Sequence, residues 1–521
     1  MSTLVCNPGR DFVNSLGIPV DNLTLSSAVA RIISMAKAKD GHARLVSTLN
    51  VDFLVNSLGT ALTKPRHPEL LDVLRSSDLV TADGFPIIWL SRLLGRPLPE
   101  RVCGSDMVPA IAEQAAREGL SLFLLGGAEG VAAKAAATLV AKNPNLKIAG
   151  TAAPFVNTSG AALATAAEDD ERLLAEIHAS EADILLVGLG NPKQELWFNR
   201  NRSQLKTPVS IGVGGTFEFI TGDTRRAPAL WRKLNLEWVY RITQDPARLW
   251  KRYAVGLCKL SVLTAPVLWA RIRETLNPGP STSPIITDLP WRRLWSSREQ
   301  SIALLELPKH VGKQYLERII AELSSDSVAG ELKILDFSKV RHIALAAQQE
   351  LFNLAALLRT QRASLQLMGM SRRVRQQLSA ARVIDLLEGD TRGALQRLTA
   401  RSPSEAEFSC NSYALGNASL VMLSGRVNRE NLTTLGFVEC LLHSIRDRSC
   451  IIDFRNVDLL ESSGIAELLP LFNRGEQNQV LLSGVGHSVK QMLRMAEIES
   501  NASLIDDSEL LALITKEHNH G

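Results

Sequence analysis

Two kinds of residue in the first half of the chain could do chemistry together: glycines that follow apolar runs, and polar side chains that follow predicted strands. The apolar runs at 121–125, 184–187 and 209–213 each lead into glycines. A buried parallel strand that breaks into a glycine turn and then a helix leaves backbone N–H groups facing outward, which suits a phosphate. The sequence therefore predicts a phosphate cradle among Gly126, Gly127, Gly212, Gly214 and Gly215.

The polar side chains are Thr48, Asn50 and Asp83. Thr48 and Asn50 lie in STLNVDF at the end of one predicted strand, and Asp83 follows the strand LVTA directly before Gly84. The carboxyl ends of parallel strands form the edge at which open α/β folds bind ligands, so we expect the three side chains to share one site. An Asp-Gly pair is also a common turn, and the other two residues are ordinary at strand ends. The residues alone leave both interpretations open.

Alternating strands and helices must position these residues. Over residues 1 to about 225 the pattern predicts a Rossmann-like parallel α/β sheet. The predicted strands are 44–48, 79–82, 121–125, 147–149, 184–187 and 209–213, and the predicted helices are 26–38, 68–76, 108–118, 131–142 and 161–180. The whole chain of 521 residues is too long for one core, so we expect about three domains.

Composition favours a soluble protein of a reducing compartment. The chain is 45% hydrophobic and 21% charged, and its six cysteines include no CxxC pair, which also argues against a structural zinc site. The first residues lack the pattern of a signal peptide. The stretch closest to a membrane span, 253–272, contains Lys259 and Pro266, so we expect no span and a cytoplasmic location.

A basic arm covers residues 225–273. It holds eleven Lys or Arg against two acidic residues, and four of the eight tryptophans of the chain. Basic residues mixed with tryptophan favour an anionic membrane surface as the partner. Nucleic acid is the rival partner, but no recognised reader motif accompanies the arm, so we expect no nucleic-acid binding.

The second half of the chain contains an internal repeat. Residues 333–358, KILDFSKVRHIALAAQQELFNLAALL, match residues 450–475, CIIDFRNVDLLESSGIAELLPLFNRG, at a spacing of 117 residues. In each copy a strand precedes the DF pair and a helix follows it, which predicts two copies of one small α/β domain. The Pro- and Ser-rich stretch 278–290 reads as the linker that precedes them.

The order of the motifs over residues 12–255 resembles the WecG/TagA/CpsF family of glycosyltransferases. The TxN motif of that family falls on Thr48 and Asn50, its DG motif on Asp83 and Gly84, and a third motif on ERVCGSD, which contains Arg101. The resemblance implies an inverting transfer of an N-acetylmannosamine-type sugar or other hexose from a UDP-sugar to a polyprenyl-diphosphate-linked sugar, in cell-surface polysaccharide biosynthesis. It also implies Asp83 as general base on the acceptor hydroxyl, which suits a carboxylate whose pKa partial burial raises. Such an enzyme is peripheral at the inner face of the cytoplasmic membrane.

The leaving pyrophosphate needs positive groups, and the sequence offers no metal site to supply them. No DxD motif ends a strand, and the nine histidines form no pair at ligand spacing outside the tail, so we expect no metal and no other cofactor. Helix N-termini with Arg101, Arg225 or Arg226 are the candidates for this role. Arg101 could instead form a surface salt bridge. Gln194 and Glu195 in NPKQE could bind the sugar or base, or form the polar first turn of a helix.

The strand–Asp–turn–SSG–helix pattern of the repeats resembles the STAS domain. The resemblance is degenerate over 300–400 and clear over 405–515, with residues 256–299 as the arm and linker between them and the first domain. It implies regulation through a protein partner, with Ser463 in the position that related domains phosphorylate. The first copy has Ala346 at that position. Ser462 could alternatively be a plain helix cap.

Two other functional classes remain open from the sequence. A Rossmann-type NAD(P)-dependent oxidoreductase would account for the glycines, but GVGGTF does not match GxGxxG and no acidic residue follows about 20 positions later to bind a ribose. A non-catalytic STAS signalling scaffold would account for the repeats, but it leaves Thr48, Asp83 and Arg101 unexplained.

Overall fold

The computed structural model describes most of the chain. The described residues are 11–58, 65–158, 166–223, 228, 231, 237–244, 246–276, 291–296, 301–325, 331–360, 364–380, 408–415, 418–434, 449–472, 480–496, 503–505 and 509. The predicted linker 278–290 therefore lies outside the described residues, as do Arg225 and Arg226.

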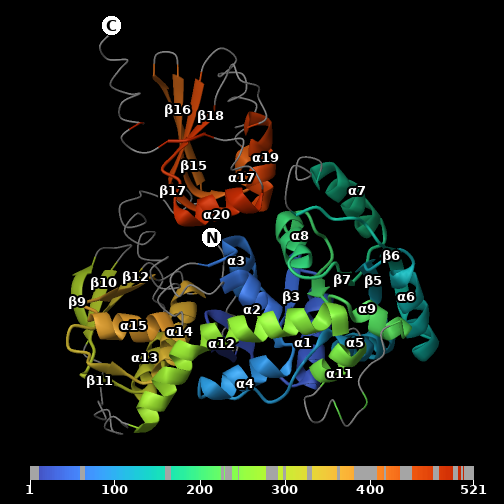
Figure 1. The fold of residues 1–521 in the computed structure, drawn as a ribbon, viewed down its shortest axis with the longest axis horizontal. Coiled ribbons are helices and arrows are strands. Elements are labelled where there is room, and N and C mark those ends of the chain that lie inside the picture. The colour runs from blue at the N-terminus through green and yellow to red at the C-terminus, as the bar shows by residue number, and fades with distance from the viewer. Residues whose placement is uncertain are drawn as a thin grey trace.

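A six-stranded sheet forms the centre of the first domain (Figure 1). Its order is β4-β3-β8-β7-β5-β6, and every neighbouring pair is parallel, which confirms the predicted α/β class. The apolar runs form the strands because helices cover both faces, so residues of either parity are buried. The strands are β3 (Arg44–Leu49), β4 (Leu79–Ala82), β5 (Ser121–Gly126), β6 (Lys147–Ala152), β7 (Ile184–Gly188) and β8 (Val209–Gly212).

Two helical layers sandwich this sheet. One core joins the sheet to α1 (Leu25–Ala38), α5 (Gly104–Glu118) and α6 (Val131–Lys142). Residues of the opposite parity, such as Phe123 and Leu125, face a second layer. That layer holds α2 (Val51–Leu58), α3 (Pro68–Ser76), α4 (Phe85–Leu93), α7 (Ala166–Ala179) and α8 (Lys193–Asn201). Helices α2 and α4 each begin directly after a strand end, at the edge where the predicted site lies.

The basic arm is mostly one long helix. After α9 (Thr216–Thr221), helices α11 (Glu237–Gln244) and α12 (Pro246–Leu276) follow, and α12 passes through the predicted domain boundary at residue 255. Leu260, Leu263 and Val267 of α12 are buried in the core that contains α2 and α4. Within the described residues, Tyr253–Arg273 is long and apolar enough to cross a bilayer by composition, although this buried face ties it to the domain.

The repeats form two sheets of the same plan. The first has the order β9-β10-β12-β14 and the second β15-β16-β17-β18-β19, each with one antiparallel edge pair and parallel pairs beyond it. The first sheet is built from β9 (Arg292–Ser296), β10 (Ser301–Glu306), β12 (Glu331–Asp336) and β14 (Ser364–Met368), beside a short pair, β11 (His310–Val311) and β13 (His342–Ile343). The second consists of β15 (Phe408–Leu415), β16 (Ala418–Val427), β17 (Ser449–Leu460), β18 (Val480–Ser483) and β19 (Ser503–Leu504).

Helices cover each repeat sheet. The first repeat carries α13 (Lys313–Ser325), α14 (Leu345–Thr360) and α15 (Arg372–Ala380), and the second carries α17 (Arg429–Thr434), α19 (Ser462–Phe472) and α20 (His487–Met495). Because β9 pairs with β10, the first repeat begins before residue 300, inside the stretch predicted as arm and linker. A hairpin at the chain start, β1 (Phe12–Ser15) and β2 (Ile18–Asp21), lies between this repeat and the first domain.

Candidate active site

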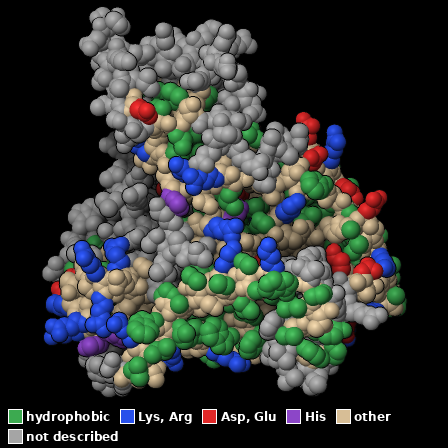
Figure 2. Space-filling model, viewed as in Figure 1, with side chains coloured by type: hydrophobic (Ala, Val, Ile, Leu, Met, Phe, Trp, Pro, Cys, Tyr) green, Lys and Arg blue, Asp and Glu red, His purple; other side chains and the backbone are tan. Residues whose placement is uncertain are grey.

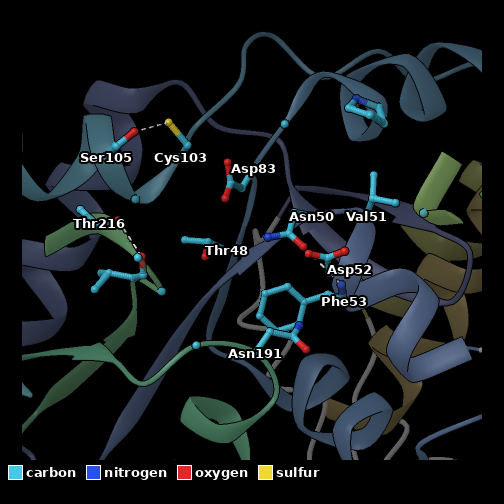
Figure 3. A pocket seen from close by; sticks show the side chains of 18 of the residues that line it. Thr48, Asn50, Val51, Asp52, Phe53, Asp83, Cys103, Ser105, Asn191 and Thr216 are labelled. Carbon is cyan, nitrogen blue, oxygen red and sulfur yellow. Dashed lines mark hydrogen bonds between the residues drawn. The ribbon is translucent and has the colours of Figure 1, made fainter. Parts of the chain in front are cut away.

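Strand register brings the predicted polar residues together. In the parallel pair β3–β4, Leu49 lies opposite Ala82, so Asn50 and Asp83 follow side by side at the carboxyl edge. The backbone N–H of Asp83 donates to the carbonyl of Leu49 at 2.8 Å, which fixes the strand end. Within β3, Thr48 Oγ1 donates to the carbonyl of Gly212 on β8 at 3.0 Å. Figure 3 shows the three side chains around one space.

That space is a cavity of about 680 Å³, within the range of ligand-binding sites. Seven of the predicted residues line it: Thr48, Asn50, Asp83, Arg101, Gln194, Gly214 and Gly215. Four others, Gly126, Gly127, Gly212 and Glu195, are not among its lining residues, and Arg225 and Arg226 lie outside the described residues.

Asn50 links the site to helix α2. Its Oδ1 accepts from the N–H of Phe53 at 3.3 Å, so Asn50 caps the helix that begins at Val51. Further along the same helix, Asn56 Nδ2 donates to Asn191 Oδ1 at 3.0 Å and joins α2 to the turn before α8. These contacts therefore hold two walls of the cavity in fixed relation.

The N-terminus of α5 forms another wall. Arg101 Nη2 lies 3.2 Å from Asp106 Oδ2, and Cys103 Sγ donates to the same oxygen at 2.9 Å. Burial, together with the charge of Asp83, raises the pKa of Cys103 to about 12, so the thiol stays protonated at neutral pH. Arg101 thus forms the salt bridge weighed in the sequence and also lines the cavity, beside the positive end of a 15-residue helix.

Gln194 holds the glycine turn after β8. Its Oε1 accepts from the N–H of Gly214 at 3.1 Å, and its Nε2 donates to Glu195 Oε1 at 2.7 Å. A Cβ at Gly212 would lie only 2.4 Å from Gln194 Nε2, so a glycine is needed there for packing. Burial raises the pKa of Glu195 to about 8, which leaves this carboxyl protonated at neutral pH behind the cavity wall.

The glycines after β5 serve close backbone packing. Gly126 has φ +105°, and a Cβ there would lie 2.6 Å from the carbonyl carbon of Gly188 on the neighbouring strand. The N–H of Gly127 donates to the Gly188 carbonyl at 3.1 Å. The structure therefore places Gly126 and Gly127 against β7 and outside the lining of the cavity, and their part in a phosphate cradle stays a prediction.

Several lining residues were not predicted from the sequence. Tyr253, Gly256 and Leu257 come from α12, so the arm completes the cavity wall. Asn191 and Asn56 also line it, and their only signal was the polar content of NPKQE and of the helix after STLN. Across the described residues, no group of three or more His, Cys, Asp or Glu side chains is placed to hold a metal ion. The metal-independent reaction stays a prediction.

A protein-family model matches the whole first domain, including α12. The model of the "Glycosyl transferase WecG/TagA/CpsF family" matches residues 13–276, which is half of the chain and includes all of α12. The chain belongs to this glycosyltransferase family. The assignment decides against the oxidoreductase and the non-catalytic scaffold as accounts of the first domain.

Two curated relatives carry the same name, N-acetylglucosaminyldiphosphoundecaprenol N-acetyl-beta-D-mannosaminyltransferase. The protein from Bacillus spizizenii is 31% identical over 192 residues, which cover 37% of this chain and 69% of the relative. The protein from Staphylococcus aureus (strain MW2) is 30% identical over 240 residues, which cover 46% of this chain and 86% of the relative. Among solved structures, an anti-sigma factor antagonist from Mycobacterium paratuberculosis matches with a TM-score of 0.20 and 15% identity, over 23% of this chain and 99% of that one.

The structure also places the predicted phosphorylation residue. Ser463 is buried in the first turn of α19, and its Oγ accepts from the N–H of Arg429 at 3.4 Å. The hydroxyl of the neighbouring Ser462 donates to the carboxylate of Glu69, which belongs to the first domain. Phosphorylation of Ser463 stays a prediction.

Proposed function

We propose that the chain transfers an N-acetylmannosamine-type sugar, or another hexose, from a UDP-sugar to a polyprenyl-diphosphate-linked sugar, with inversion. The observation that carries the proposal is the convergence of Asp83, Thr48 and Asn50 on one cavity, which Arg101 and the N-terminus of α5 also line. The relatives' names describe this class of donor sugar and acceptor lipid.

We assign the proton transfer to Asp83, which lines the cavity. In the proposed step it takes the proton of the acceptor hydroxyl while that oxygen forms a bond to the anomeric carbon of the donor. The bond from this carbon to the UDP diphosphate breaks on the opposite face, so the configuration inverts. Thr48 donates to a main-chain carbonyl, which leaves its oxygen able to accept from a substrate hydroxyl. Asn50 uses its Oδ1 as the helix cap, which leaves its amide NH₂ group to donate to a substrate oxygen.

The leaving diphosphate gains charge as the bond breaks. Backbone N–H groups at the start of α5, with Arg101 beside them, are fixed donors that need no reorganisation. On the β8 side of the cavity the N–H of Gly214 is bonded to Gln194, so the proposal uses the backbone N–H of Gly215 as the further donor there. We propose that these groups replace a metal ion, and that no other cofactor takes part.

The exposed face of α12 suits a lipid-linked acceptor. Trp250 and Trp269 are 59% and 61% exposed, and Leu257 is both exposed and part of the cavity lining. Figure 2 shows hydrophobic side chains gathered along the band where Figure 1 draws α12 and α4. Lys251 and Arg273 are exposed on the same helix, so we propose peripheral binding to an anionic cytoplasmic membrane face, with the cavity opening toward the lipid.

The test is transfer from UDP-N-acetylmannosamine to a diphosphate-lipid-linked N-acetylglucosamine, followed by mass spectrometry of the product. Asp83→Asn should lower the turnover by about 10²–10⁴-fold and leave donor affinity within about threefold, because a general base acts on the acceptor. Asp40→Asn is the matched control: it makes the same change in the exposed loop before β3, at the opposite edge of the sheet. Near wild-type turnover in Asp83→Asn would remove Asp83 from the mechanism.

A further inference from the structure

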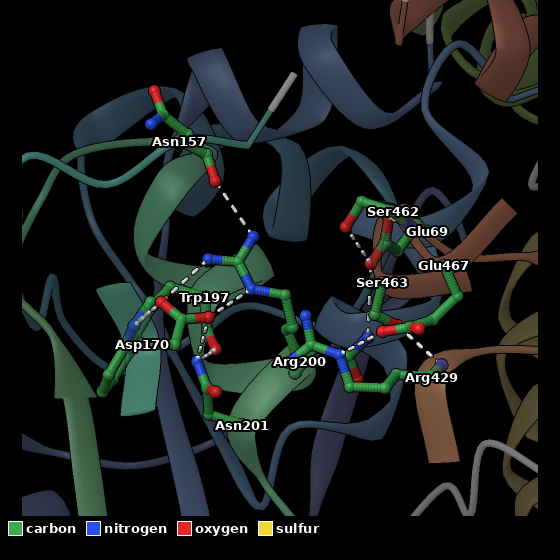
Figure 4. Close-up of polar contacts among 11 residues, drawn as sticks. Glu69, Asn157, Asp170, Trp197, Arg200, Asn201, Arg429, Ser462, Ser463 and Glu467 are labelled. Carbon is green, nitrogen blue, oxygen red and sulfur yellow. Dashed lines mark hydrogen bonds and ion pairs between the residues drawn. The ribbon is translucent and has the colours of Figure 1, made fainter. Parts of the chain in front are cut away.

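The two STAS-like repeats contact the transferase domain in different ways. The first repeat shares apolar cores with it: Phe12 of β1 is buried in the core of the repeat, and Leu345 of α14 is buried in the core that holds α2, α3 and α4. The second repeat rests on α3 and α8 through polar side chains (Figure 4). An apolar core that spans two domains is permanent, whereas a polar contact between domains resembles a transient interface.

Both repeats contact the transferase domain through the same part of their fold. Leu345 is the first residue of α14 and Ser462 is the first residue of α19, and the two positions are 117 residues apart, the spacing of the repeat. The start of the helix after the DF strand is therefore the docking face in both copies. The first copy has an apolar residue there and the second has a serine.

Glu69 of α3 receives the start of α19. Its carboxylate accepts from the backbone N–H of Ser462 at 2.9 Å and from Ser462 Oγ at 3.0 Å, so a residue of the transferase domain caps a helix of the repeat. Asn199 of α8 donates to Glu69 at 3.4 Å and to Glu461 at 3.1 Å. Glu69 is fully buried in this arrangement, with 0% of its surface exposed.

The charges in this contact are unbalanced. Arg426 lies 2.9 Å from Asp72 of α3 and also pairs with Glu461, so one guanidinium serves two carboxylates besides the nearby Glu69. Burial and the charge of Glu461 raise the pKa of Glu69 to about 7. A further negative charge at Ser462 would lie directly against Glu69, in a cluster that also holds Asp72, Glu461 and Glu467 and the cations Arg426 and Arg429. Two carboxylates in direct contact repel each other strongly in a buried site.

We propose that the start of α19 is a releasable docking site on the transferase domain, held by Glu69 and Asp72, and that negative charge at Ser462 releases it. The first repeat stays attached through its apolar core, so only the second repeat separates from the transferase domain on release. The start of α19 is occupied by Glu69 while the repeat is docked, so a protein that binds this face must compete with α3. The second repeat is thus a domain whose partner face is occupied in cis.

The test uses the full chain with Ser462→Asp. Aspartate is a good residue at a helix start, so any opening reflects its contact with Glu69 rather than loss of the helix. The expected result is a larger radius of gyration in small-angle X-ray scattering and amide exchange about 100-fold faster in α3 and α19, with the β17 core of the repeat still protected. Ser371→Asp is the matched control, since Ser371 is an exposed helix-start serine of the first repeat.

Two further variants keep the proposal open to refutation. Ser462→Asp with Glu69→Gln should close the domain again, because the new amide donates to the new carboxylate. Asp72→Arg should open it from the other side, by placing a second cation beside Arg426. Wild-type scattering and exchange in both Ser462→Asp and Asp72→Arg would overturn the proposal. So would an open Ser462→Asp variant that Glu69→Gln fails to close while the repeat remains folded.

Discussion

Replacing Asp170 by asparagine should destabilise the wall of the active site. Asp170 of α7 accepts four hydrogen bonds from α8: from Arg200 Nε at 2.6 Å, Arg200 Nη2 at 3.0 Å, Trp197 Nε1 at 3.0 Å and Asn201 Nδ2 at 3.0 Å. Figure 4 shows this cluster. Arg200 and Asn201 are the last residues of α8, whereas Gln194 lies in its first turn. Helix α8 thus presents a cavity residue and is anchored by one buried carboxylate.

The expected cost follows from burial. The side chain of Arg200 is 0% exposed and that of Asp170 is 4% exposed, so the pair is out of water. An amide in place of this carboxylate keeps one acceptor oxygen, turns an NH₂ group toward groups that are themselves donors, and leaves the guanidinium without a counter-charge. Breaking a buried ion pair by removing one partner costs about 3–5 kcal/mol.

Amide exchange within α8 is the assay, because a chain of several domains has no single unfolding free energy. Asp170→Asn should lower the local opening free energy of α8 by about 3–5 kcal/mol. Glu113→Gln is the control, since Glu113 and Arg117 pair on the surface at 57% and 67% exposure and should contribute at most about 0.5 kcal/mol. A loss of less than about 1 kcal/mol in Asp170→Asn would refute the view that this carboxylate anchors the helix.

Three other predictions test the membrane face, the metal and the docking site. Trp250→Ala with Trp269→Ala should weaken binding to anionic vesicles, measured by co-sedimentation, whereas unchanged binding would show that α12 is not the contact. Transfer should persist in EDTA; its loss there and recovery with Mg²⁺ or Mn²⁺ would reveal a metal site. Docking of the second repeat should weaken as pH rises from about 4.5 through about 7, because the docked Glu69 has the raised pKa and binds its proton more tightly. Exchange in α3, corrected for its intrinsic pH dependence, should therefore be faster at pH 8 than at pH 6, and Glu69→Gln should reduce this difference.

The positions of the strand ends were enough to predict which residues lie together at the centre of the cavity. Apolar runs of β-branched residues indicated the positions of β3 and β4, and parallel pairing then placed Asn50 beside Asp83 without any knowledge of the rest of the fold. The argument works because a strand end is a local feature, and because all carboxyl ends of a parallel sheet share one edge. The helices that begin at this edge, α2 and α4, were not predicted, since each is short and follows its strand with no separating loop.

Glycine and buried acids were harder to interpret. A glycine after a strand looks the same in sequence whether it serves a phosphate or a close backbone neighbour, and at Gly126 only the position of Gly188 decides between them. Glu195 sits beside a true cavity residue, Gln194, yet the helical turn sends it into the core. Residues one position apart on a helix point about 100° apart, so adjacency in a motif does not imply a shared role.

The contacts between domains lie beyond any local pattern. Ser462 bonds to a carboxylate 393 residues earlier in the chain. In sequence, a serine at the start of a helix can be a cap, because the helix N-terminus needs an acceptor. In the structure Ser462 is the first residue of α19, and its hydroxyl donates to Glu69 instead of serving as that acceptor. The structure supplies the acceptor from Glu69 of another domain, which frees the serine hydroxyl to donate. The need of a helix N-terminus for an acceptor therefore brings Ser462 into the contact between domains. The equivalent residue of the first repeat, Leu345, makes an apolar contact instead, so charge at this position should act on the second repeat and not on the first.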